Sequence, residues 1–283
     1  MKKKLPPGPW KLPIIGNMHQ LMGSLPHHAL KNLAQKHGDL MHLQLGEISA
    51  IVASSPRIAK EILKTNDLTF ANRPEILAGK ILFYNNSDIG FSPYGDYWRQ
   101  MRKICTLELL NNKSVRSFAS IRKDEAKNLI SSIREQAALK LESQKKGMIN
   151  LTQKIISYTN SMLCRAAFGR AFGLHRDKVM NLLKEAALRT SGFDVSDVFP
   201  SWKILHHLSL MKPKLMELHR EFDDILETII QQHLVNPTGR NGEFGEEDLI
   251  DVLLRIKHTG DPNLPITNTN IKAVLLVNFQ QVN

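Results

Sequence analysis

The chain has few cysteines and no long apolar run, and these two absences exclude several classes of protein. Two cysteines in 283 residues, Cys105 and Cys164, cannot form the framework of a disulfide-stabilised secreted domain, and both sit in helical patterns typical of small buried side chains. No stretch approaches the ~20 apolar residues that a membrane-spanning helix needs. Met1–Lys4 has no apolar run behind it, which predicts neither a signal peptide nor an anchor.

The sequence also lacks the common motifs of metal, nucleotide and nucleic-acid sites. There is no zinc-ligand spacing, no basic zipper, no Gly-rich phosphate loop and no G-x-S-x-G nucleophile turn. Asp248 and Asp251 are interpreted as a solvated helix start rather than an acid–base pair. The formal net charge of +11 therefore favours an acidic protein partner or an anionic membrane over nucleic acid.

The apolar periodicity predicts a mainly α fold with a small β-sheet. Residues 41–45 and 50–53 read as two strands, and residues 26–37 and a segment opened by Pro56 read as helices. From residue 96 onward the chain is predicted to be nearly all helix, over residues 96–110, 115–138, 151–168, 176–190, 212–234 and 247–257. Apolar residues in the fifth of these helices form one stripe: Leu215, Leu218, Phe222, Ile225, Leu226 and Ile229.

Two local features are candidates for function. Residues 74–93 are apolar but show no sustained period, as in a binding loop or in a loop that is merely packed on the core. Trp98 and Arg102 are four residues apart in a predicted helix, so they share one face. Such a pair can be an ordinary surface stack or part of a binding site.

Further motifs precede this pair: Leu5-Pro6-Pro7-Gly8-Pro9-Trp10, Leu12-Pro13-Ile14-Ile15-Gly16-Asn17, Phe70-Ala71-Asn72-Arg73-Pro74 and Phe91-Ser92-Pro93-Tyr94-Gly95. In this order they resemble the N-terminal half of a plant microsomal cytochrome P-450, a haem-thiolate monooxygenase. The likeness is greatest to the subfamily that oxidises sesquiterpenes and related terpenoids, and it runs from Lys4 to about Phe279.

The resemblance implies a haem cofactor with Trp98 and Arg102 at a haem propionate, because a guanidinium fork and an indole N–H both donate to carboxylates. Arg99 and Lys103 would face solvent. The resemblance also implies an apolar small-molecule substrate, an NADPH-cytochrome reductase as partner, and a place on the cytosolic face of the endoplasmic reticulum membrane. The expected pocket residues are Ile81, Leu82 and Phe83, with Phe193 and Val195 closing the pocket from the opposite side.

Other parts of the family's pattern are not found in the sequence. Neither cysteine lies in the loop that holds the iron, so no catalytic residue and no metal ligand is assigned. The predicted central helix begins at Ile271 and departs from the family pattern over the last seven residues, where Val277 takes the place of an acidic residue. The hydrophobic anchor expected before the Pro-rich hinge is also missing, which an engineered trim or an incomplete gene model would explain.

The sequence therefore predicts a hinge over residues 1–17 and an incomplete cytochrome P-450 domain over residues 18–283. The leading hypothesis is the N-terminal portion of a monooxygenase that oxidises an apolar small molecule, a terpenoid, and that is inactive without the rest of the enzyme. The alternative is a truncated, non-catalytic product with at most a binding role.

Overall fold

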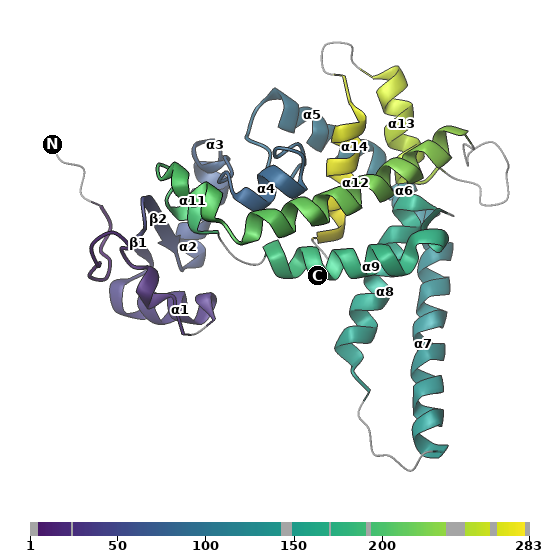
Figure 1. The fold of residues 1–283 in the computed structure, drawn as a ribbon, viewed down its shortest axis with the longest axis horizontal. Helices are drawn as coiled ribbons and strands as arrows, with labels where there is room; N and C mark the ends of the chain where they lie inside the picture. Colours follow the sequence, from purple (N-terminus) through teal and green to yellow (C-terminus); the bar gives the residue numbers. More distant parts are fainter. Residues whose placement is uncertain are drawn as a thin grey trace. The chain divides into compact units, whose positions relative to one another are not determined.

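The computed structural model describes residues 5–23, 25–142, 149–169, 171–190, 194–235, 247–260 and 265–280 (Figure 1). Two compact units make up the chain. Unit 1 comprises Met1–Leu77 with Phe193–Pro213, and unit 2 comprises Ala78–Gly192 with Lys214–Asn283. The predicted boundary between a hinge and a single domain at residue 17 is not decided by this division and stays a prediction.

The sheet lies in unit 1 and consists of an antiparallel pair, β1 (Leu40–Leu45) and β2 (Ile48–Ala53). Leu45 pairs with Ile48, so Gly46 and Glu47 form the turn, and Gly46 adopts the left-handed conformation (φ 59°) that glycine tolerates best. Met41 and Leu43 are buried on one face of β1. The predicted strand pair is confirmed, with β2 starting two residues earlier than expected.

The proline-rich lead-in is docked along β1 rather than free of it. The backbone N–H of His42 donates to the carbonyl of Pro7 (2.9 Å), and that of Asn17 donates to the carbonyl of Gln44 (2.6 Å). Gly16 has φ 61°, and a Cβ there would lie 2.1 Å from the Gln44 carbonyl oxygen. Only glycine allows this close approach without a shift of the backbone.

Short helices complete unit 1. The longest is α1 (Pro26–His37), which ends at Gly38, and Ser55 caps α2 (Pro56–Lys60) by accepting the Ile58 N–H. The others are η1 (Met18–Gln20), η2 (Glu61–Thr65), α3 (Asp67–Phe70), α10 (Val195–Val198) and α11 (Lys203–Leu208).

Unit 2 is helical. Its elements in chain order are α4 (Leu77–Leu82), α5 (Asp96–Ile104), η3 (Cys105–Leu109), α6 (Asn112–Ser117), α7 (Ala119–Glu142), α8 (Leu151–Phe168), α9 (Ala171–Thr190), α12 (Met211–Val235), α13 (Leu249–Thr259) and α14 (Asn268–Gln280). The first residues of α4 and α12 are counted with unit 1. The six predicted helices are confirmed, with α5 followed by one wider π-helical turn, η3, and with residues 115–138 falling in α6 and α7.

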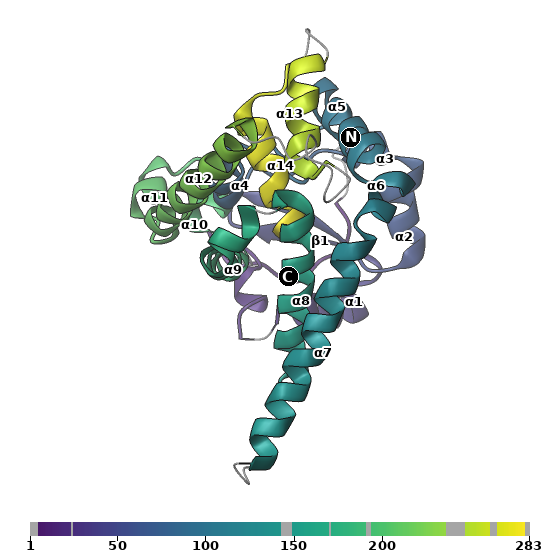
Figure 2. The same ribbon diagram turned by 90° about the vertical axis from the view of Figure 1, so that its right-hand side faces the viewer.

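The core of unit 2 forms around α14. This helix packs against α8, α9 and α13 (Figure 2). Its residues from Ile271 to Val277 are all buried. The predicted apolar stripe of α12 is buried along its whole length. Within the described ranges, no helix has the length and hydropathy to cross a bilayer.

Candidate functional site

The helix α5 presents the candidate cofactor residues on one face. Trp98 and Arg102 are one turn apart, and the Arg102 guanidinium carbon lies 5.1 Å from the centre of the Trp98 ring. The indole N–H of Trp98 donates to the backbone carbonyl of Ile89 (3.0 Å). The stacked pair is therefore observed, and the Trp98 side chain also fastens the preceding loop to α5.

Arg102 differs from its neighbour Arg99 in its partners. Arg99 forms an ion pair with Asp96 and lies over the Tyr94 ring. Arg102 is exposed, and among the carboxylates that the structure describes none lies within ion-pair distance of it. A guanidinium that is held on an aromatic ring and has no acidic partner can accept a bidentate carboxylate from a ligand.

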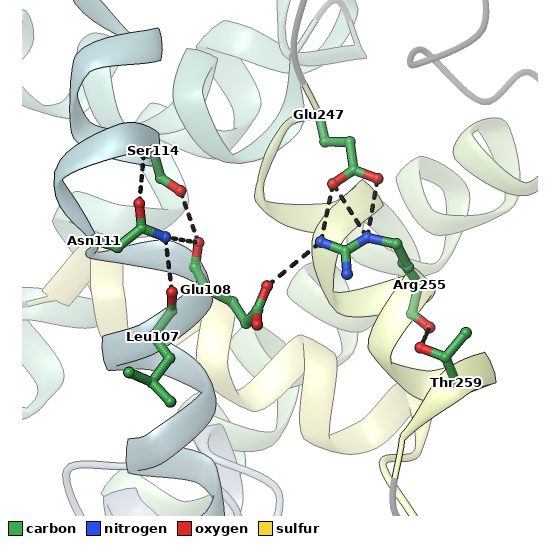
Figure 3. Close-up of polar contacts among 7 residues, drawn as sticks. All are labelled: Leu107, Glu108, Asn111, Ser114, Glu247, Arg255 and Thr259. Carbon is green, nitrogen blue, oxygen red and sulfur yellow. Dashed lines mark hydrogen bonds and ion pairs between the residues drawn. The ribbon is translucent and has the colours of Figure 1, made fainter.

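A polar network fastens the other end of the α5–η3 segment to α13 (Figure 3). The Arg255 guanidinium of α13 pairs with Glu247 (3.0 Å) and with Glu108 of η3 (3.5 Å). The hydrogen bond that Arg255 donates to Glu247 is the main reason why the pKa of Arg255 is raised. Because all three groups are nearly half exposed, this network contributes more to the orientation of α5 than to stability.

The turn that follows η3 is capped by side chains (Figure 3). The Asn111 side-chain oxygen accepts the backbone N–H of Ser114 (2.9 Å), and its amide donates to the carbonyls of Leu107 (2.7 Å) and Glu108 (3.1 Å). The Asn111 amide thus donates to backbone carbonyls at the end of the π-helical turn η3, where the helix no longer supplies N–H partners.

The predicted substrate-lining segment is more regular than the sequence suggested. It contains the short helix α4, after which Tyr84, Asn85 and Asn86 all have positive φ values of 51–58°. Three consecutive left-handed residues other than glycine are rare, and asparagine tolerates this conformation better than tyrosine does. The prediction of a wholly irregular segment missed both features.

Leu82 and Phe83 are buried, and Ile81 is half-buried. The Phe83 ring stacks on that of Phe91 at a centroid distance of 5.2 Å. Asp88 closes the same segment by accepting the backbone N–H groups of Gly90 (2.6 Å) and Phe91 (2.9 Å), while burial raises the pKa of its carboxyl. The segment is thus packed on the core of unit 2.

The structure does not test the two residues predicted on the opposite side of the pocket. Phe193 lies outside the described residues. Val195 is exposed at the start of α10 in unit 1, whereas residues 81–83 belong to unit 2. Their participation in one pocket stays a prediction.

Both cysteines are buried thiols. Cys105 is the first residue of η3 and Cys164 lies within α8, and burial raises their pKa values to about 11 and about 12, respectively. A thiol ligates iron as the thiolate, and burial in apolar surroundings opposes that form. This environment supports the prediction that neither cysteine is an iron ligand.

The interpretation of Asp248 as a solvated residue is wrong. Asp248 is buried and caps α13 by accepting the Asp251 N–H (2.9 Å), and its other oxygen lies 2.8 Å from Nε2 of His233 at the end of α12. The partner is 15 residues earlier in the chain and no local pattern connects the two. The sequence could therefore identify the helix start but not its burial.

His233, Asp248 and Asp251 also bring three potential ligand atoms within 4.8 Å of one another. Both ring nitrogens of His233 face acceptors, however, because Nδ1 lies 2.8 Å from the carbonyl of Ile229 and Nε2 faces Asp248. A ring with two acceptor partners carries two protons and has no lone pair for a metal. The cluster is best described as a buried ion pair.

Comparison with known proteins places the chain in a family. The profile of the family Cytochrome P450 matches residues 6–280. Premnaspirodiene oxygenase of Hyoscyamus muticus is 52% identical over 98% of this chain and 54% of the relative, and 5-epiaristolochene 1,3-dihydroxylase of Nicotiana tabacum is 53% identical with the same coverage. Germacrene A hydroxylase of Saussurea costus is 46% identical over 98% of this chain and 54% of the relative.

The fold agrees with this assignment. A solved structure of a zebra fish cytochrome P450 with progesterone superposes with a TM-score of 0.69 over 92% of this chain and 56% of that chain, at 18% identity. The chain belongs to the cytochrome P450 family, as the sequence motifs predicted. Members of this family are haem-thiolate monooxygenases, and this chain spans about half the length of the curated relatives it matches.

Proposed function

We propose that this chain forms the N-terminal half of a monooxygenase that oxidises a terpenoid hydrocarbon. The observation that carries the proposal is the match of 98% of the chain, at about half identity, to an oxygenase of premnaspirodiene and a dihydroxylase of 5-epiaristolochene. In the overall reaction one atom of O2 enters the substrate as a hydroxyl. The other atom leaves as water, with two electrons and two protons supplied through NADPH and its reductase.

The haem, when bound, supplies the activation of O2. The residues described above fit it at one point, because the Arg102 guanidinium is exposed, is oriented by the Trp98 ring and has no carboxylate partner in the described part of the chain. Arg102 would hold a propionate through two N–H donors. The Trp98 N–H already donates to Ile89, so Trp98 would act as the surface on which Arg102 is held.

Residues of the α4 segment would shape the apolar part of the substrate site. Leu82, Phe83 and the stacked Phe91 ring offer apolar area and few polar groups, which suits a hydrocarbon and excludes water. Ile81 at the end of α4 would belong to the same pocket. The product of oxidation would then depend on how these side chains orient the substrate.

The surfaces support two further partners. Arg99 and Lys103 are exposed on α5, and together with the net charge of +11 they favour an acidic docking face such as that of the reductase.

Unit 1 exposes several large apolar side chains, namely Leu5, Trp10, Ile14, Trp202, Ile204 and Leu210. Large exposed apolar residues of this kind favour contact with a lipid surface. We propose that the complete enzyme lies on the cytosolic face of the endoplasmic reticulum membrane, as the family resemblance implies.

A chimera tests the proposal. Residues 1–276 of this chain are joined within α14 to the remaining C-terminal part of premnaspirodiene oxygenase, and the protein is loaded with haem. Addition of premnaspirodiene, 5-epiaristolochene or germacrene A is expected to shift the haem absorption spectrum when the hydrocarbon binds. A haem-loaded chimera that responds to none of these hydrocarbons, while the intact relative responds, would contradict the proposal.

A further inference from the structure

The left-handed turn at Tyr84–Asn86 follows directly on the two buried residues of the proposed substrate segment. Leu82 and Phe83 precede it, and the Phe83 carbonyl accepts the backbone N–H of Ser87 across the turn (2.8 Å), so the turn is coupled to the backbone that carries these side chains. Asn85 and Asn86 suit the conformation, but Tyr84 does not, because its Cβ crowds the following carbonyl. Some interaction elsewhere must hold Tyr84 in place.

Two side chains of α12 provide that interaction. The Tyr84 hydroxyl donates to Oδ1 of Asp223 (2.8 Å), and the His219 ring contacts the Tyr84 ring at a centroid distance of 4.6 Å. The backbone of Leu82 is among the groups that act on the pKa of His219, so the ring lies close to this residue as well. His219 and Asp223 are one helical turn apart on α12, so both reach the Tyr84 side chain.

A buried lysine of α14 fixes the α12 side of this arrangement. The Lys272 ammonium lies 2.7 Å from Oδ1 of Asp223 and 2.8 Å from Oε2 of Glu227, and only 8% of its side chain is exposed. Burial lowers the pKa of Lys272, but its bonds to Asp223 and Glu227 outweigh that effect and raise it, so the ion pair persists at neutral pH. Burial and the Asp223 bond keep the Tyr84 hydroxyl protonated as a donor by raising its pKa.

We propose that Tyr84, His219, Asp223 and Lys272 form a positioning clamp that sets the orientation of Leu82 and Phe83 and thereby the regioselectivity of the oxidation. The link to regioselectivity rests on the function proposed above, whereas the clamp itself does not. The clamp joins three segments, residues 82–84, α12 and α14, which are far apart in the sequence. None of its members needs to touch the substrate, so each acts through the backbone of the turn.

A second contact limits where the clamp can act. The Tyr97 hydroxyl donates to the carbonyl of Ser87 (2.6 Å) and accepts from the Asn270 side chain (2.9 Å). The far end of the turn is therefore fixed to α14 independently of Tyr84. Loss of the Tyr84 hydroxyl should free residues 82–86 and leave the segment beyond Ser87 in place.

The test uses Tyr84→Phe, which removes one oxygen and keeps the ring against His219. Amide hydrogen exchange is measured by mass spectrometry on the 283-residue chain and on the haem-loaded chimera. Exchange over residues 82–87 should become about fivefold faster or more, the change expected when one ordinary hydrogen bond is lost. Tyr158→Phe on α8 is the matched control and should change nothing in this segment.

His219→Phe tests the contact between the His219 ring and Tyr84 by the same exchange measurement. In the chimera, Tyr84→Phe should also change the ratio of oxidised products while the haem content stays the same. Unchanged exchange in both Tyr84→Phe and His219→Phe would overturn the clamp. Faster exchange with an unaltered product ratio would overturn its role in regioselectivity. Absence of any substrate response in the parent chimera would count against the proposed function, while the exchange comparison still decides the clamp.

Discussion

The buried His233–Asp248 pair is expected to make a large, pH-dependent contribution to the stability of unit 2. The perturbation is Asp248→Asn, which keeps the side-chain oxygen that caps α13 and removes the charge that faces His233. Burial lowers the pKa of His233, but the hydrogen bond to Asp248 and its charge outweigh burial and raise it to about 9. The side chains of His233 and Asp248 are only 5% and 8% exposed, so solvent screens the pair little.

The magnitude follows from the shift in pKa. A rise from 6.5 to about 9 corresponds to about 3.4 kcal/mol in favour of folding when the ring is protonated in both states. Because the folded-state pKa is the higher one, this stability is fully present below the unfolded pKa near 6.5 and is lost as the pH rises through about 9. At pH 7 about 2.5 kcal/mol remains, close to the lower end of the ~3–5 kcal/mol cost of breaking a buried ion pair.

The assay is urea denaturation of the chain, followed by helical circular dichroism at several pH values between about 6 and 10. Asp248→Asn should lose about 2–3 kcal/mol at pH 7, and its deficit relative to the parent should shrink toward pH 10. Asp67→Asn is the control, since Asp67 is exposed and bonds only the N–H of the next residue. A deficit that is the same at every pH, or equal to that of the control, would refute the ion-pair assignment.

Three further predictions concern the haem and the substrate. Arg102→Ala in the chimera should lower haem occupancy, since a propionate would lose its bidentate partner, and Arg102→Lys should restore it only in part. Equal occupancy in Arg102→Ala and Arg99→Ala would instead leave the Trp98–Arg102 pair as a surface stack. Phe83→Ala should change the product profile or the substrate affinity of the chimera by product analysis and spectral titration, and an unaltered profile would place the pocket elsewhere. The 283-residue chain alone should give no thiolate-type Soret band with CO after reduction, and a clear band would refute the assignment of its two cysteines.

The sequence was sufficient for the parts of the fold that depend on periodic burial. The apolar stripe of α12 repeats over six positions, and Met41 and Leu43 alternate with more polar residues in β1, so both patterns were visible in the sequence. The sequence also predicted the first residue of a helix where a side-chain cap or a proline marks it, as at Ser55–Pro56. The π-helical turns at Glu61–Thr65 and Cys105–Leu109 were missed because they extend a helix without changing its composition.

Long-range partners explain what the sequence could not show of the site. Tyr84 adopts a conformation that its own residue type disfavours, and the partner that holds it, Asp223, lies 139 residues later. The sequence alone suggests that Asp248 is a solvated helix cap, and only the structure shows its contact with His233. The Trp98–Arg102 spacing, in contrast, is local to one helix, and its geometry followed from the sequence alone.

The central claim is that this chain belongs to an enzyme that inserts oxygen into a terpenoid hydrocarbon. The most direct measurement is product analysis by gas chromatography and mass spectrometry after the haem-loaded chimera turns over premnaspirodiene with reductase, NADPH and O2. The account predicts a product one oxygen atom heavier than the substrate, formed only when both NADPH and O2 are present. Complete recovery of the unmodified hydrocarbon, together with full haem loading and a working intact relative in parallel, would contradict it.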